Sequence, residues 1–232
     1  MVLQIFKIFR TRKAELLHTN EIIMDNTKNH IDLRTYVFLD SLQLQMASYL
    51  STVSKGYLPV GGQTCCIVEI APGIEINTLT DVALKATNVT PGMQIVERAF
   101  GMLEVHSDNQ GDTRMAGEAV LNSIGKKESD RMKPRILTSQ LIKNVEDHHA
   151  QLINRTRWGM MLLRGDTLFV LEVEPAGYAY YAANEAEKSA DINIIDVRGF
   201  GKFGRIYIGG KESDVLECKM NVEKRLAEIT GK

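Results

Sequence analysis

The sequence is poor in cysteine, lacks a long apolar run and carries almost no net charge. Its three cysteines, Cys65, Cys66 and Cys218, have no metal-ligand spacing, which argues against a disulfide framework and favours a reducing cytosol. No apolar stretch approaches the roughly 20 residues that span a bilayer, so no membrane partner is expected. A net charge of −1 lacks the basic surplus typical of proteins that bind nucleic acid. The remaining class is a globular protein with one large domain or two small ones.

The N-terminus does not resemble a typical signal peptide. Its apolar stretch, residues 2–9, is short and precedes the basic residues Arg10, Arg12 and Lys13, whereas a signal peptide has its charges first. Residues 1–31 are therefore interpreted as a leader. Three alternatives stay open: a disordered segment, a short amphipathic peptide that docks on a membrane or partner, and a segment upstream of a true start at Met24.

An internal repeat dominates the rest of the chain. Matching residues recur 103 positions apart, in the pairs Gly56 and Gly159, Gly62 and Gly165, Thr64 and Thr167, Glu69 and Glu172, Pro72 and Pro175, and Lys85 and Lys188. The offset is taken to fall to 100 at Phe100 and Phe200, which implies three extra residues before the first glycine turn. It is 102 at Val120 and Val222. We predict two tandem domains, residues 32–128 and 134–232, with a polar linker at 126–133.

Each copy shows the same order of predicted elements. A strand (35–39 or 135–137) and a helix or irregular segment (43–53 or 144–153) precede a β-hairpin, whose two strands are 56–60 and 65–69, or 160–163 and 168–172. A helix (76–87, or an alanine-rich one from Pro175 to Ala190) follows. Two further strands (94–96 and 102–105, or 194–197 and 205–208) flank the glycine turn, before a last helix (112–123 or 212–229). This pattern predicts an α+β fold, with helices on one face of a mainly antiparallel sheet.

These residues resemble the bacterial microcompartment (BMC) shell domain. The resemblance is clearest at residues 168–173, 179–192 and 197–210, and the Pro134-Arg135 pair that normally closes the domain comes first, as in a circular permutation. Residues 34–42, 95–101 and 182–188 are similar to carboxysome members, and residues 103–110 look closer to the β-carboxysome type than to the α-carboxysome type. The resemblance implies tandem ferredoxin-like domains, a pseudohexameric homotrimer and a place in the carboxysome shell of the bacterial cytoplasm.

The resemblance also implies where a pore would lie. Glu97, Arg98, Ala99, Phe100 and Gly101 in the first copy, and Arg198, Gly199, Phe200 and Gly201 in the second, would alternate around a threefold axis, with Glu97 and Arg98 as the gate. Without the repeat and the resemblance, Glu97 and Arg98 would be interpreted as an exposed pair worth well under 1 kcal/mol. Lys85 and Lys188 match the family's tile-edge lysine, although each could be an ordinary solvated lysine.

Three functions remain to be weighed. The first is a non-enzymatic shell tile without cofactor or metal that passes bulky phosphorylated metabolites, such as ribulose bisphosphate and phosphoglycerate. It would contact other shell hexamers and could stack as two trimers. The second is a ligand-binding regulator built on the duplicated α+β domain, with its sites between the copies. The basic loop at 154–158 could bind a phosphorylated metabolite or be an ordinary polar surface loop. The third is an enzyme that uses His148, His149 or Cys66, none of which has an evident catalytic partner.

Overall fold

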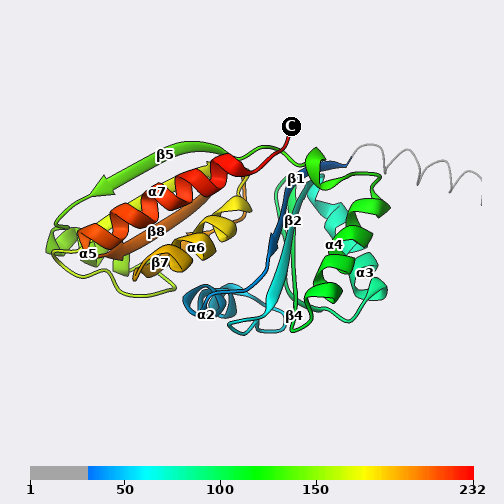
Figure 1. The fold of residues 1–232 in the computed structure, drawn as a ribbon, viewed down its shortest axis with the longest axis horizontal. Helices are drawn as coiled ribbons and strands as arrows, with labels where there is room; N and C mark the ends of the chain where they lie inside the picture. Colours follow the sequence, from blue (N-terminus) through cyan, green and yellow to red (C-terminus); the bar gives the residue numbers. More distant parts are fainter. Residues whose placement is uncertain (1–30) are drawn as a thin grey trace, which may run out of the picture.

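Residues 31–232, the part of the chain that the computed structural model describes, form two four-stranded antiparallel sheets (Figure 1). The strand order is β1–β2–β4–β3 in the first sheet and β5–β6–β8–β7 in the second. The strands are β1 (Asp32–Leu39), β2 (Thr64–Ala71), β3 (Thr90–Glu97), β4 (Phe100–Ser107), β5 (Arg135–Ile142), β6 (Thr167–Glu174), β7 (Asn193–Arg198) and β8 (Gly204–Gly210). The predicted leader, apart from Ile31, and the alternative start Met24 lie outside the described residues.

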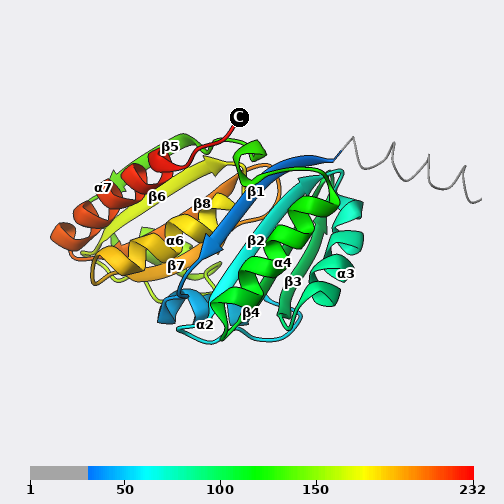
Figure 2. The same cartoon turned by 45° about the vertical axis from the view of Figure 1, so that its right-hand side comes forward.

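Two helices cover one face of each sheet, and a short helix follows the first strand of each copy (Figures 1 and 2). The helices are α3 (Ile76–Ala86) and α4 (Gln110–Ser123) on the first sheet, α6 (Tyr178–Ser189) and α7 (Glu212–Glu228) on the second, and the short α2 (Leu44–Val53) and α5 (Asp147–Asn154). The predicted α+β layer is confirmed. Helix α7 shows why it forms, because Val215, Cys218, Val222 and Leu226 recur every three or four residues and are buried. No helix within residues 31–232 has the length and apolar character needed to cross a membrane.

Strand pairing corrects the predicted register of the repeat. Cys65 pairs with His106 and Leu168 pairs with Gly209, so β2 and β4 both lie 103 positions before β6 and β8. The turn strands keep this offset, since Gln94 pairs with Leu103 and Val197 pairs with Ile206. The first copy therefore has no three extra residues. The counterpart of Phe100 is Phe203, and Phe200 is the counterpart of Glu97.

The prediction that each hairpin begins with a strand before the glycine turn is wrong. Residues 56–60 and 160–163 are loops, because β2 already pairs with β1 on one side and β4 on the other, and β6 is flanked by β5 and β8 in the same way. These loops instead lie against the bulge of the turn strand, where the Gly56 amide donates to the Gly92 carbonyl at 2.9 Å. A Cβ atom on Gly56 would come within 2.5 Å of the Pro91 carbonyl oxygen, and one on Gly159 within 2.3 Å of the Ile194 oxygen. This close approach explains why both copies have glycine there.

The two copies share one apolar core. Helix α6 of the second copy packs against the first sheet on the face opposite to α3 and α4, so that α6 and β1 lie side by side (Figure 2). The shared cluster of buried residues includes Val37, Leu39, Ile67, Met93 and Met102 from the first copy and Ala179, Ala182, Ala183 and Ala186 from α6. The alanine face of α6 is small, which lets the helix approach the sheet closely.

Candidate pore turns at the junction of the two copies

The turn between β3 and β4 contains only two residues, Arg98 and Ala99, since Glu97 pairs directly with Phe100. Arg98 has a φ of 54°, the left-handed region that is costly for a side-chain-bearing residue by about 1–2 kcal/mol. Its counterpart 103 positions later is Gly201, which also has a positive φ, of 95°. The two copies thus share a positive φ at this point, although the second turn is longer, since its last strand pair is Arg198 with Arg205. The first copy has an arginine where the second has the residue that a positive φ favours.

The side chains of Glu97 and Arg98 are held weakly. The Arg98 side chain is 93% exposed, and its Nε lies 4.0 Å from the Glu97 Oε1, at the outer limit of an ion pair. Such an exposed pair stabilises a single geometry very little. The backbone of this turn is fixed more firmly, since the Gly73 amide donates to the Ala99 carbonyl at 2.8 Å. The turn therefore combines an anchored backbone with two weakly paired side chains.

The second turn is fixed by packing. Gly199 lies against the ring of Tyr180 on α6, where an added Cβ would come within 2.2 Å of a ring carbon. Arg198 donates from Nε to Asp196 Oδ2 at 3.0 Å, and this bond raises the pKa of the arginine further. Asp196 also accepts from the Tyr49 hydroxyl at 2.9 Å. The second turn is thereby tied to both α6 and α2.

The structure brings the two turns together within one chain. Residues from both line one small void, namely Glu69, Ile95, Glu97, Phe100, Gly101, Met102, Phe200 and Gly201. A Cβ built on Gly201 would lie 3.9 Å from the Cγ of Glu97. Five of the nine residues predicted at the pore, Glu97, Phe100, Gly101, Phe200 and Gly201, therefore line one void, although no single stretch of sequence contains them.

The two predicted tile-edge lysines have different surroundings. Lys85 on α3 is exposed and binds Asp81 one helical turn earlier at 2.6 Å. Lys188 on α6 is partly buried at the junction, where its Nζ lies 2.8 Å from Asp40 of the first copy and 3.0 Å from Glu185. The hydrogen bond from Lys188 lowers the pKa of the Asp40 carboxyl. Lys188 thus forms an ion pair with the other copy, through Asp40, whereas Lys85 pairs only within its own helix.

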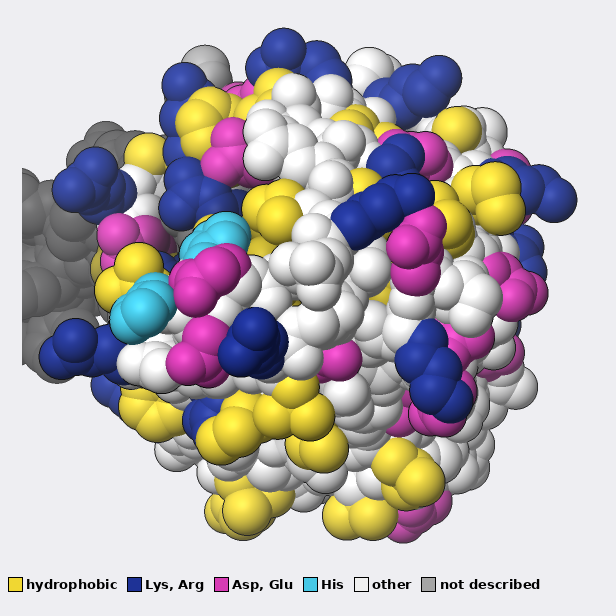
Figure 3. Space-filling model, turned by 90° about the vertical axis from the view of Figure 1, so that its left-hand side faces the viewer, with side chains coloured by type: hydrophobic (Ala, Val, Ile, Leu, Met, Phe, Trp, Pro, Cys, Tyr) yellow, Lys and Arg dark blue, Asp and Glu magenta, His cyan; other side chains and the backbone are white. Residues whose placement is uncertain are grey.

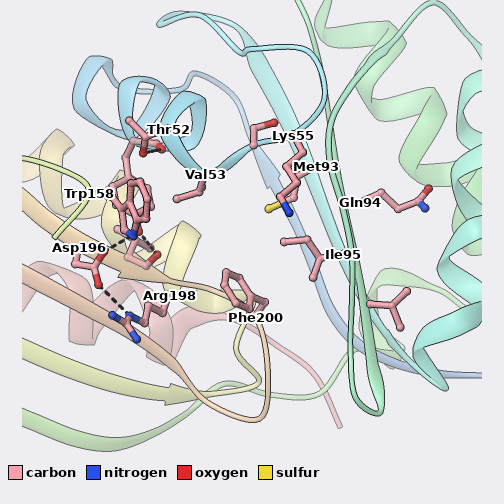
Figure 4. A pocket seen from close by; sticks show the side chains of 14 residues that line it. Thr52, Val53, Lys55, Met93, Gln94, Ile95, Trp158, Asp196, Arg198 and Phe200 are labelled. Atoms are coloured by element: carbon pink, nitrogen blue, oxygen red, sulfur yellow. Dashed lines mark hydrogen bonds and ion pairs between the residues drawn. The ribbon is translucent and has the colours of Figure 1, made fainter. Parts of the chain in front are cut away.

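A groove of about 730 Å³ separates the turn strands of the two copies (Figure 4). Lys55 and Met93 approach it from the first copy, and Trp158, Arg198 and Phe200 from the second. Trp158 is 62% exposed. The groove combines two cations with aromatic surface, a chemistry suited to organic anions, although one of the cations is already paired with Asp196.

Sequence reasoning missed a buried pair beneath the first turn. Arg34 on β1 donates from Nε to Glu69 Oε1 at 3.1 Å, and the guanidinium lies over the Phe100 ring, 3.8 Å from its centroid. Burial raises the pKa of the Glu69 carboxyl, against the opposing bonds from the Gly177 amide, Arg34 and Thr35. The repeat of Glu69 and Glu172 was a visible signal of this site, but nothing in the sequence indicated that Arg34 reaches Phe100.

The residues weighed for catalysis are not assembled into an active site. His148 is exposed and lies 3.2 Å from Glu146, whose carboxylate also accepts from the amides of His148 and His149 at the start of α5. Cys66 is buried, and burial raises its pKa to about 12, so the thiol stays protonated at neutral pH. Among residues 31–232, no group of three or more His, Cys, Asp and Glu side chains is placed to hold a metal ion.

Comparison with known proteins identifies the family. The family model "CsoS1D N-terminal domain" matches residues 33–130. The chain is 52% identical over 202 residues to the carboxysome shell protein CcmP of Synechococcus elongatus, a match that covers 87% of this chain and 95% of the relative. The chain belongs to the CcmP and CsoS1D family of carboxysome shell proteins. The carboxysome shell proteins CsoS1D of Hydrogenovibrio crunogenus and Prochlorococcus marinus are 46% and 48% identical, and the matches cover 86% and 87% of this chain and 98% and 79% of those proteins.

Solved structures confirm the tandem permuted fold of this carboxysome shell protein. A fused permuted hexameric shell protein from the RMM microcompartment superposes with a TM-score of 0.84 at 44% identity, covering 87% of this chain and 99% of that one. A double ringed trimeric shell protein from the same microcompartment gives 0.84 at 39% identity, with 88% and 99% coverage. The chain therefore has two tandem circularly permuted BMC domains, and its place is the carboxysome shell in the bacterial cytoplasm.

Proposed function

We propose that three copies of this carboxysome shell protein form a pseudohexameric tile with a central pore gated by Glu97 and Arg98. The observation that carries the proposal is the geometry shared by Arg98 and Gly201. An arginine occupies a backbone position that favours glycine, its side chain is almost fully exposed, and the pair with Glu97 is at the limit of contact. A residue held at this cost without a structural partner is typical of a functional site.

Electrostatics support a gate at this position. Three Glu97 carboxylates around a threefold axis would repel one another, whereas three interleaved Arg98 guanidinium groups would offset that repulsion. A modest rotation of the Arg98–Ala99 turn would exchange the side chain that faces the axis. Two packings of similar energy make a switch. The neighbouring turn from the second copy, with Gly199 packed on Tyr180, would form the fixed part of the rim.

The exposed faces of the two copies support the trimer. Within the chain, α6 buries the outer face of the first sheet, and β1 is almost entirely buried. The equivalent strand of the second sheet, β5, is partly or fully exposed along its whole length. Helix α3, the counterpart of α6, exposes Leu84, and Ile74 just before it is exposed as well. Threefold repetition would place α3 of one chain on the second sheet of the next and bury both surfaces.

The charges at the rim favour anionic metabolites as the transported class. Arg98, Arg198 and Lys202 all belong to the two turns or border them, and Lys55 and Arg198 line the adjoining groove. Bulky phosphorylated sugars and acids, such as ribulose bisphosphate and phosphoglycerate, fit a wide cationic opening. In this role the chain acts as a conduit without catalysis.

Two further contacts complete the proposed assembly. Matching loops of the two copies expose apolar side chains, Tyr57, Leu58 and Val60 in the first and Met160, Met161 and Leu163 in the second. Six such patches on one trimer would form a surface on which a second trimer can stack. Figure 3 shows apolar patches among mixed charges at the end of the molecule that carries the second copy. Lys85 and Lys188 are proposed to contact neighbouring shell hexamers at the tile edge.

The test compares the purified wild-type protein with Glu97→Ala and Arg98→Ala variants. Electron microscopy should show hexagonal discs, and the pore geometry and passage of phosphoglycerate across assembled shells should change in both variants. The Glu212→Ala variant, which removes the exposed ion pair between Glu212 and Lys143, is the control and should behave as wild type. Unchanged pores and passage in both turn variants would refute the gate. A stable monomer would instead favour the alternative, a regulator that binds an anion in the groove between the copies.

A further inference from the structure

We infer that Arg34 is the positioning residue of the first pore turn and couples its conformation to the junction between the two copies. Arg34 is remote from the turn in sequence and only 8% exposed, so it contacts no metabolite directly. It acts through Phe100, which closes the two-residue turn by pairing with Glu97. This inference deepens the proposed gating function by naming what sets the gate's resting position.

The first step is the hold of Arg34 on Phe100. The Arg34 guanidinium carbon lies 3.8 Å from the centroid of the Phe100 ring, in face-on contact. A cation over an aromatic face is attracted by the ring quadrupole, and the attraction is stronger when both groups are out of water. Since Phe100 follows Arg98 and Ala99 directly, a shift of the ring has to move the backbone that carries the gate.

The second step links Arg34 to the other copy. Its Nε donates to Glu69 Oε1, while Glu69 Oε2 accepts from the Thr35 hydroxyl at 2.8 Å and from the Gly177 amide at 3.0 Å. Gly177 is the residue from which α6 of the second copy begins. The buried Glu69 thus receives bonds from both copies, and a change in how α6 sits on the first sheet would reach Phe100 through this carboxylate and Arg34.

The third step is the contrast with the second copy. Leu137 occupies the position that corresponds to Arg34, and the cation over the corresponding Phe203 ring is the exposed Lys202 of the turn itself, whose Nζ lies 5.0 Å from the ring centroid. Glu172, the counterpart of Glu69, is bound instead by Arg205, which is about half exposed. Only the copy that carries the Glu97–Arg98 turn has the buried arginine, although the strand order is the same in both copies. The contact between Arg34 and Phe100 therefore occurs only in the copy with the proposed gate and is not required by the fold that both copies share.

The Arg34 guanidinium also has a donor that could form a hydrogen bond in a second conformation of the turn. Within the described residues, Arg34 Nη2 is buried and has no protein acceptor, and Nη1 contacts only the Met132 sulfur, at 3.8 Å. A buried donor without an acceptor is unfavourable. A rearranged turn that presented a carbonyl oxygen to Nη2 would satisfy it, which would offset part of the loss of the Phe100 contact.

The experiment measures the turn in two independent ways in the full chain. Hydrogen exchange at the Gly73 amide, which donates to Ala99, reports the position of the turn, and electron cryomicroscopy of the assembled particle reports the ratio of pore-turn conformations. Arg34→Leu and Phe100→Leu should each shift that ratio about 5- to 30-fold and should speed Gly73 exchange by a similar factor. Phe100→Tyr, which keeps the ring face, and Arg205→Leu, which removes the arginine bound to Glu172 in the second copy, should leave both readouts at wild-type values.

Each outcome separates this inference from the gate itself. If Arg34→Leu fails to fold because Glu69 is left unpaired, Phe100→Leu decides, since it preserves the Arg34–Glu69 pair. Wild-type values in Phe100→Leu for both readouts would overturn the positioning role. Faster Gly73 exchange with a single, unchanged pore conformation would support Arg34 as the residue that positions the turn and would refute gating by Glu97 and Arg98.

Discussion

Helix α2 depends on the other copy for its N-terminal cap. Its own N-cap residue, Gln43, makes no side-chain capping bond. Glu187 of α6 supplies the acceptors instead, since its two carboxylate oxygens accept from the amides of Gln45 at 2.8 Å and Met46 at 2.9 Å. A carboxylate at a helix N-terminus gains from charge-assisted hydrogen bonds and from the helix dipole. The Glu187→Ala variant should therefore lose the cap and weaken the junction together.

The magnitude follows from these two bonds. Hydrogen bonds to a charged group contribute about 1.5–3 kcal/mol when buried, and a lost N-cap costs about 1 kcal/mol. Because the site is only partly buried, we expect Glu187→Ala to lower the free energy of unfolding by about 2 kcal/mol, and Glu187→Gln, which keeps one acceptor oxygen, by about half as much. A loss of that size corresponds to roughly 30-fold faster local exchange of the two amides.

The assay is equilibrium urea unfolding combined with hydrogen exchange at Gln45 and Met46. The matched control is Glu146→Ala, because Glu146 caps α5 from within its own copy through the amides of His148 and His149. That variant should destabilise α5 and leave the exchange of Gln45 and Met46 unchanged. Unaltered exchange of Gln45 and Met46 in Glu187→Ala would refute the cap that is shared between the copies.

Three further predictions concern single contacts. The lowered pKa of Asp40, caused first by its bond from Lys188, means that this carboxylate adds stability above its unfolded pKa of about 3.9 and loses it as the pH falls through the lower folded value. Asp40→Asn should thus cost under about 1 kcal/mol at pH 7, since the Asp40 carboxyl is largely exposed, and the cost should shrink as the pH falls through the folded pKa, as measured by urea unfolding. Gly199→Ala should cost about 1–3 kcal/mol in thermal unfolding, because its Cβ would overlap the Tyr180 ring, and Tyr180→Ala in the same chain should remove that clash. Cys66 should resist thiol reagents at pH 8 in the folded protein and react fully in urea; rapid labelling of native protein would contradict its buried, raised-pKa state.

The duplication could be read from sequence because backbone contacts require particular residues. Gly56 and Gly159 recur since no side chain fits against the turn strand, and Glu69 and Glu172 recur at the same sheet position. The register of the pore turn failed for a local reason. Phe100-Gly101 matches both Phe200-Gly201 and Phe203-Gly204, and only the strand pairing shows that the second match is the structural one.

The periodic pattern of apolar residues could not predict contacts between segments that are distant in the sequence. The hairpin prediction failed because a glycine-bounded apolar run looks like a strand whether or not a sheet edge is free to receive it. The stacking of Arg34 on Phe100 and the capping of α2 by Glu187 join residues from opposite ends of a copy or from different copies. No spacing rule encodes such pairs, because folding alone brings these residues together.

The junction inside the chain uses polar contacts that its counterpart between chains would lack. These contacts join Asp40 with Lys188 and the α2 amides with Glu187. At the positions 103 residues away, the second copy has Lys143 in place of Asp40, and the first has Leu84 in place of Glu187. In the proposed trimer, α3 of one chain would pack on the second sheet of the next. Lys85 would then approach Lys143, and α5, which caps itself through Glu146, would receive no carboxylate from α3. The interface between chains would therefore have fewer polar contacts than the junction within a chain and would depend more on burial of apolar residues such as Ile74 and Leu84.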